Sequence, residues 1–91
     1  MIKVDLNVGT TINLPSIPST GYQWTMAPSD NVQVQEDFIS NAESDEEVGS
    51  GGTSVFRLSF NLPGKYEISF NYSRPWLNEV LDSKVYHFDV S

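Results

Sequence analysis

The sequence predicts an all-β protein, an antiparallel sandwich of about seven short strands that forms a single domain over residues 1–91. Apolar and polar residues alternate through most of the chain, as they do in strands with one buried face. No stretch combines a helical period with caps, because Ser40 to Glu43 and Ser44 to Glu47 have the spacing of capping boxes but no apolar stripe follows them. Along the chain, a short connection after one run is followed by a long connection after the next.

Each expected strand is an alternating run rich in aromatic and β-branched residues, bounded by Gly, Pro or Asn. The runs cover residues 2–7, 11–14, 22–26, 32–39, 53–60, 65–72 and 84–90. Their apolar members are, in chain order, Ile2, Val4 and Leu6; Ile12 and Leu14; Tyr22, Trp24 and Met26; Val32, Val34, Phe38 and Ile39; Phe56, Leu58 and Phe60; Tyr66, Ile68, Phe70 and Tyr72; Tyr86, Phe88 and Val90. We expect Trp24 to be buried as the core tryptophan of the third strand.

The lengths of the connections predict where a binding surface lies. The short connections are 8–10, 27–31 and 61–64, and the long ones are 15–21, 40–52 and 73–83. If successive strands run in opposite directions, every second connection lies at the same end of the sandwich. The three long connections would then cluster, as the binding loops of immunoglobulin variable domains do. Long loops in a compact domain are usually functional or disordered.

Composition excludes several classes of function. Twelve acidic residues against five basic ones give a formal net charge of −7, which disfavours both nucleic acid and an anionic membrane as partners. The absence of cysteine excludes disulfides, a thiol nucleophile and thiolate metal ligands. No apolar run approaches the ~20 residues of a membrane span, and the start of the chain has no leader-like apolar segment. These features leave the compartment open between the cytoplasm, a lysosome-like vesicle, and secretion if a leader has been removed.

The three long connections differ in composition. The first carries Pro15 and Pro18, which fix φ and stiffen it, and Gly21, which permits a positive φ at a bend. The second is acidic over residues 43–47 and ends in Gly49-Ser50-Gly51-Gly52, glycines that suit either a flexible turn or a close approach of another backbone. A solvated acidic loop is the default interpretation of its first half.

The third long connection places Arg74 beside Pro75 and Trp76, and Arg and Trp are enriched in binding hot spots. Trp76 is either exposed or folded over the core with Arg74 stacked on it. Asn71-Tyr72-Ser73 fits a glycosylation acceptor, which we expect to be unused.

Catalysis and metal binding have little support. The single histidine, His87, alternates outward on the last strand, and no nucleophile-elbow motif is present. A calcium loop starting at Glu43 would need Gly at Val48 and Glu at Ser54, so that register fails. The glycine-rich segment lacks the Lys of a phosphate loop. We expect no catalytic residue, no cofactor and no metal.

Three segments, in order, resemble one family over most of the chain. Pro18-Ser19-Thr20-Gly21-Tyr22 is similar to an Asn-Pro-Thr-Thr-Gly-Tyr/Phe loop, Gly49-Ser50-Gly51-Gly52 to a Gly-x-Gly-Gly loop, and Arg74-Pro75-Trp76 to an Arg-Pro-Trp loop. These loops are typical of chagasin-type inhibitors of papain-like cysteine proteases. The resemblance implies an immunoglobulin-like sandwich without disulfides. The chain departs from the pattern at Ile17, which stands in place of the Asn, and at Ser19, which replaces the first Thr.

The resemblance implies reversible, tight inhibition without chemistry, in a one-to-one complex with a cathepsin-type protease. We expect the free chain to be a monomer. The tip of the first loop, Ser19-Thr20-Gly21, would cover the catalytic cysteine and histidine. Gly51-Gly52 would lie along the non-primed side of the cleft, and Trp76, supported by Arg74, on the primed-side wall. The implied contact residues are Pro18, Ser19, Thr20, Gly21, Tyr22, Gly49, Ser50, Gly51, Gly52, Arg74, Pro75 and Trp76.

Two other classes of function remain as alternatives. A non-inhibitory immunoglobulin-like module could bind another protein or a glycan through the same loops, and a glycan site would favour exposed aromatic side chains among Tyr22, Trp24 and Trp76. The solvent accessibility of Trp24 helps to distinguish these hypotheses, because a glycan site would favour an exposed Trp24. An enzyme would need a pocket and a general base, neither of which the sequence identifies.

Overall fold

A computed structural model describes residues 1–17, 20–40, 51–74, 76–77 and 79–91 of the chain. These residues form seven strands: β1 (Ile2–Val4), β2 (Thr10–Ser16), β3 (Gln23–Met26), β4 (Val32–Ser40), β5 (Gly52–Phe60), β6 (Gly64–Ser73) and β7 (Val80–Val90). The all-β class and the expected number of strands are confirmed. In the part of the chain that the structure describes, no helix is long and apolar enough to cross a membrane.

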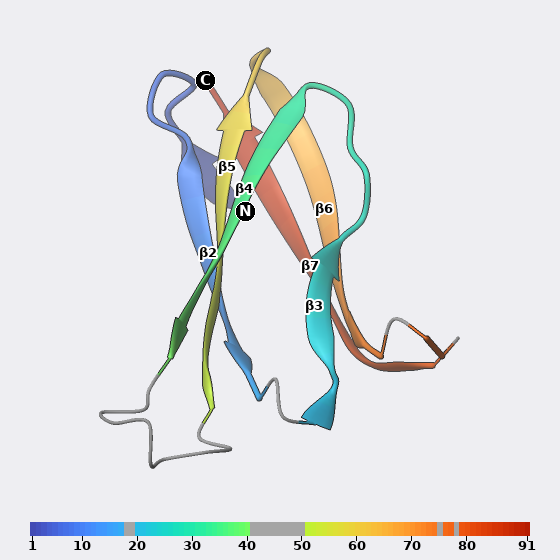
Figure 1. Ribbon diagram of the computed structural model, residues 1–91. Coiled ribbons are helices and arrows are strands. Elements are labelled where there is room, and N and C mark those ends of the chain that lie inside the picture. Colours follow the sequence, from blue (N-terminus) through green and yellow to red (C-terminus); the bar gives the residue numbers. More distant parts are fainter. Residues whose placement is uncertain (18–19, 41–50, 75, 78) are drawn as a thin grey trace.

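The strands form two sheets that pack face to face (Figure 1). One sheet has the order β1-β7-β6-β3 and the other the order β2-β5-β4. Every pair is antiparallel except β1 and β7, which run parallel with Ile2 opposite Phe88. This is an immunoglobulin-like sandwich in which the first strand joins the sheet of the last strand.

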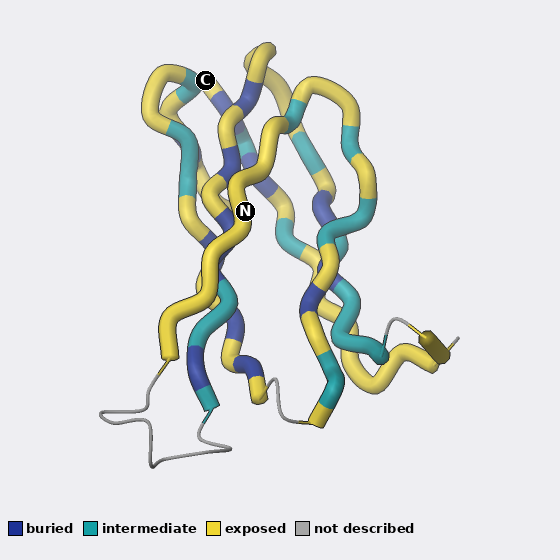
Figure 2. The backbone as a smooth tube through the Cα atoms, in the orientation of Figure 1, coloured by how far each residue is buried: buried dark blue, intermediate teal, exposed yellow. Residues whose placement is uncertain are grey.

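The buried residues lie on the strands of both sheets (Figure 2), and the core between the sheets combines aromatic and aliphatic side chains. Phe56, Phe70 and Phe88 are among the most deeply buried side chains, and Trp24 is only 6% exposed, as expected. The rings of Phe56 and Phe70 meet edge to face at 4.9 Å, a geometry that adds to the gain from burial. On the central strands β5 and β6, the apolar residues of the alternating pattern therefore face the core, as the sequence predicts.

The two ends of the sandwich differ in the length of their connections. Residues 5–9, 27–31 and 61–63 connect strands at one end, which we call the turn end. Residues 17–22, 41–51 and 74–79 connect them at the other, the loop end, and we call these segments loop one, loop two and loop three. The clustering of the long connections is thus confirmed by the positions of the flanking strand ends (Figure 1).

Two strand boundaries differ from the prediction by three residues or more, and the others differ by two residues or fewer. The first strand ends at Val4 rather than at residue 7, because Asp5 closes a turn in which the backbone N–H groups of Val8 and Gly9 donate to its carbonyl. Gly9 takes a φ of +78° there. The last strand begins at Val80 rather than at residue 84, so loop three is shorter than expected and more of the β6–β7 hairpin is paired.

The prediction that β4 has a buried face is wrong. Val34, Phe38 and Ile39 are all exposed, and only Val32 packs against the core. The reason is geometric: β4 is the edge of its sheet, and β3 at the edge of the facing sheet is only four residues long. Little of the opposite layer is therefore present to cover the inner face of β4.

Candidate binding site

The structure describes seven of the twelve candidate contact residues. Pro18, Ser19, Gly49, Ser50 and Pro75 lie outside the described residues, as does the acidic run over 43–47. The described candidates come from all three loops and lie at the same end of the sandwich. They are Thr20, Gly21, Tyr22, Gly51, Gly52, Arg74 and Trp76.

Two local hydrogen bonds join Thr20 to Ile17 and stabilise a bend in loop one. The N–H of Thr20 donates to the carbonyl of Ile17 at 3.1 Å, and the Thr20 hydroxyl donates to the same oxygen at 2.7 Å. Gly21 follows with a φ of +82°, the left-handed conformation predicted for the bend. The family pattern has an Asn at the position of Ile17, and Ile17 has no polar side chain. The bend is instead stabilised by the Thr20 hydroxyl and by backbone groups.

A column of stacked side chains supports loop one from beneath. The Arg74 guanidinium lies 4.5 Å from the centre of the Tyr22 ring, which stacks on Tyr72 at 5.3 Å, and Tyr72 in turn packs on Trp24 at 4.8 Å. The Tyr72 hydroxyl accepts a hydrogen bond from the N–H of Ile17 at 3.3 Å, and Trp24 Nε1 donates to the carbonyl of Pro15 at 2.8 Å. The column ties loop one to the buried tryptophan of the core.

Arg74 also joins loop three to loop one directly. Its Nε donates to the carbonyl of Thr20 at 3.1 Å while its guanidinium covers Tyr22. Arg74 is therefore stacked on Tyr22, not on Trp76. Both a charge-assisted hydrogen bond and a cation–π contact favour one relative placement of the two loops.

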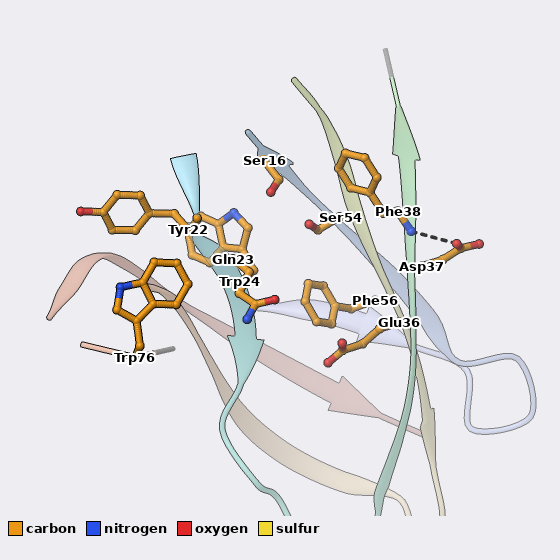
Figure 3. A pocket seen from close by; sticks show the side chains of 11 residues that line it. Ser16, Tyr22, Gln23, Trp24, Glu36, Asp37, Phe38, Ser54, Phe56 and Trp76 are labelled. Carbon is orange, nitrogen blue, oxygen red and sulfur yellow. Dashed lines mark hydrogen bonds between the residues drawn. The ribbon is translucent and has the colours of Figure 1, made fainter. Parts of the chain in front are cut away.

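Trp76 is exposed, which resolves the two interpretations of this residue. Its side chain is 68% accessible. The edge of the ring lies against loop one, since a Cβ built on Gly21 would come within 2.5 Å of Trp76 Cη2. Trp76 and Tyr22 both line an open groove of ≈670 Å³. Figure 3 shows these two rings together on one side, across from Phe38 on β4.

The two described glycines beside loop two are held close to their own sheet. Gly52 pairs with both Ser16 and Ser40, and a Cβ there would lie 2.4 Å from the carbonyl oxygen of Ile39 and from the Phe38 ring. A Cβ on Gly51 would come within 3.1 Å of the carbonyl oxygen of Ser16. The sequence suggested that these glycines allow another backbone to come close. In the structure the neighbouring backbones are those of β2 and β4 of the same chain, and Gly52 is buried.

Exposed apolar side chains gather at the loop end. Among the residues that the structure describes, more than half of the large apolar residues with high exposure lie there, in or beside the three loops: Ile17, Phe38, Ile39, Trp76, Leu77, Val80 and Leu81. Clusters of this kind mark interaction surfaces in soluble proteins. The arrangement can bind a protein surface by shape and apolar contact.

The described residues offer no cluster of metal-binding side chains. They contain no group of three or more His, Cys, Asp or Glu side chains placed to hold a metal ion. His87 is exposed on β7 opposite Glu67, with its side chain on the outer face of the sheet, as its alternation predicted. Of the three aromatic residues considered for a glycan, only Trp76 is broadly exposed.

Sequence reasoning missed three contributors to this site. Tyr72 was named as a strand residue and in the Asn71-Tyr72-Ser73 triplet but not as a site residue, although its place two residues before Arg74 put it on the same face as that arginine and next to loop three. The backbone groups of Pro15 and Ile17 that receive or donate the bracing hydrogen bonds carry no signal in the sequence. Val80 and Leu81 were assigned to a loop because the alternation before residue 84 is weak.

Comparison with known proteins agrees with the geometry. Residues 3–90 match the Chagasin family peptidase inhibitor I42. The chain is 29% identical over 79 residues to chagasin of Trypanosoma cruzi, an alignment that covers 80% of this chain and 71% of that protein.

Solved structures show the same architecture. The crystal structure of the cysteine protease inhibitor EhICP2 from Entamoeba histolytica superposes with a TM-score of 0.85 and 28% identity, covering 99% of this chain and 85% of that one. The solution structure of Amebosin shares the fold with a TM-score of 0.66 at 19% identity, covering 98% of this chain and 94% of that one. The match of the family over nearly the whole chain, with the same seven-stranded sandwich, shows that this protein belongs to the chagasin family of peptidase inhibitors.

Proposed function

We propose that this protein is a reversible, tight-binding inhibitor of papain-like cysteine proteases of the cathepsin type, acting as a monomer in a one-to-one complex. It blocks the active-site cleft with the loop end of the sandwich. The observation that carries the proposal is the contact between loops one and three in the free protein, where Arg74 Nε donates to the carbonyl of Thr20. EhICP2, whose structure is similar, is itself described as a cysteine protease inhibitor.

Each loop has a proposed place on the protease. The tip of loop one, Ser19-Thr20-Gly21, covers the catalytic cysteine and histidine without offering a peptide bond in a cleavable position. Loop two, with the glycine-rich segment Gly49-Ser50-Gly51-Gly52 at its end, lies along the non-primed side of the cleft. Loop three lies on the opposite wall, with Trp76 as its anchor.

The physical basis of inhibition is preorganisation. Association costs translational freedom and the ordering of loops, so a surface that is already assembled retains more of its contact energy. Here the stack from Arg74 through Tyr22 and Tyr72 reaches the buried Trp24, whose Nε1 donates to the carbonyl of the conformationally restricted Pro15. An exposed tryptophan on such a support has the properties of a binding hot spot.

The test is a titration of papain, with its active-site concentration known, by increasing amounts of this protein near pH 6 and near pH 7.5. We expect inhibition that is complete at about one equivalent, and a 91-residue chain that stays intact on prolonged incubation. Rapid cleavage of the chain would contradict the proposed pose of loop one. No inhibition of papain or of cathepsin-type enzymes at micromolar concentration would favour a binding module without inhibitory activity.

A further inference from the structure

The start of β7 continues the apolar surface of loop three. Val80 is 57% exposed and Leu81 62%, although both lie within the paired β6–β7 hairpin. Together with Trp76 and Leu77 they place four exposed apolar residues within six positions of the chain. Glu79 is the charged residue among them. Exposure of this much apolar surface on one hairpin tip is unfavourable in water unless a partner covers it.

A β-bulge sits at this point of the hairpin. Tyr72 is opposite Asp82, but the next residue of β6, Ser73, is opposite Val80, so Leu81 has no partner in the register. The bulge thus makes Leu81 the extra residue of β7, next to the position where Tyr72 supports loop one. Bulges change the aim of a side chain and are common beside functional sites.

Leu81 also borders a groove that reaches the other loops. The groove, of ≈500 Å³, runs between the ends of β2 and β7, and its lining includes Ile17, Gly51, Tyr72, Leu81 and Asp82. Asp82 already accepts a hydrogen bond from the N–H of Ser83 at 2.8 Å. The apolar surface around Leu81 is therefore continuous with loops one and two, not an isolated patch.

We propose that Val80 and Leu81 form a fourth contact region for the inhibited protease, in addition to the three loops, and that Leu81 receives an apolar side chain from the wall of the protease cleft that loop three contacts. This inference rests on the proposed function. Because the groove shares Ile17 and Gly51 with the edges of loops one and two, a protease seated on those loops reaches it. An aliphatic or aromatic side chain is the occupant that fits, since neither Val80 nor Leu81 offers a polar group.

Leu81→Ala tests the proposal against a matched control, Leu62→Ala. Leu62 is 52% exposed and lies in the β5–β6 turn at the opposite end of the sandwich, so both variants remove the same atoms from an exposed leucine. Each variant is measured for its dissociation rate from papain whose active-site cysteine has been blocked. We expect Leu81→Ala to dissociate about fivefold faster than the unsubstituted protein, and Leu62→Ala to stay within about twofold of it.

Two further measurements complete the test. Leu81→Met keeps an apolar side chain of similar size and should restore the dissociation rate to within about twofold. Sedimentation of the free protein at about 100 μM identifies a competing occupant, because a dimer that Leu81→Ala converts to a monomer would assign the patch to a second copy and overturn the proposal.

Equal dissociation rates for Leu81→Ala and Leu62→Ala would also overturn it. If the unsubstituted protein does not bind papain at all, the proposed function fails together with the inference that rests on it. The arm without a substitution distinguishes that failure from a failure of the Leu81 contact alone.

Discussion

The two ends of the sandwich use the same kinds of residue for different purposes. At the turn end, Gly9 has a φ of +78° and Tyr66 donates its hydroxyl to the carbonyl of Leu62, and both features close short connections over the core. At the loop end, Gly21 has a φ of +82° and the hydroxyl of Tyr72 accepts from Ile17, and both features shape a surface that faces outward. A glycine or tyrosine therefore either closes a turn over the core or shapes the proposed binding surface, according to the connection in which it lies.

The glycine pair gives the largest expected effects. A Cβ on Gly9 would lie 2.3 Å from the carbonyl oxygen of Leu58, and a Cβ on Gly21 2.5 Å from Trp76. We expect Gly9→Ala to lower the free energy of unfolding by about 1–3 kcal/mol while leaving protease affinity of the folded protein unchanged. Gly21→Ala should instead weaken protease binding by about 30-fold or more, because it displaces Trp76 and the bend of loop one.

Denaturant unfolding and inhibition titrations on the same preparations check this comparison. Equal losses of affinity in the two glycine variants would mean that the two ends are not functionally separate. Trp76→Ala serves as the reference for loss of the anchor, and its unfolding midpoint should hardly change because the side chain is mostly exposed.

The tyrosine pair sharpens the comparison by removing single hydroxyl groups. Tyr72→Phe keeps the ring between Tyr22 and Trp24 but removes the acceptor of the Ile17 hydrogen bond. We expect it to weaken protease binding about three- to tenfold through a less ordered loop one, and to speed amide exchange at Ile17. Tyr66→Phe should cost about 1 kcal/mol of stability with no change in binding.

Amide hydrogen exchange in the free protein measures how far Tyr72→Phe loosens loop one at Ile17, and it needs no protease. A Tyr72→Phe variant with unaltered exchange at Ile17 and unaltered binding would show that stacking alone holds loop one. A loss of binding in Tyr66→Phe would instead link the turn end to recognition.

The smallest effect concerns the acidic run of the second long connection. Replacing Glu43, Asp45, Glu46 and Glu47 by their amides should change the association rate with a protease at about 0.02 M salt, with little change in dissociation. The difference should vanish near 0.5 M salt, where charges more than a few ångströms apart are screened. Stopped-flow measurements at both salt concentrations test this effect of the acidic run. An unchanged association rate at low salt would contradict the prediction.

Much of the fold followed from residues whose environment is set by local alternation. The aromatic runs on β5, β6 and β7 bury one face wherever they occur, so Phe56, Phe70 and Phe88 could be placed in the core from the sequence. The position of the long connections followed from strand parity. The same logic failed on β4, since alternation alone does not reveal that a strand lies at an edge with little opposite it.

The sequence by itself determined the class of fold, the family and the loops that meet at one end, because these depend on periodicity, turn residues and short motifs that are local along the chain. Only the tertiary structure decided how that end is assembled. The stack of Arg74, Tyr22, Tyr72 and Trp24 brings together residues up to 52 positions apart, from Tyr22 to Arg74. The bulge at Leu81 depends on the register between two strands. Both are consequences of strand pairing and packing, which no single segment encodes.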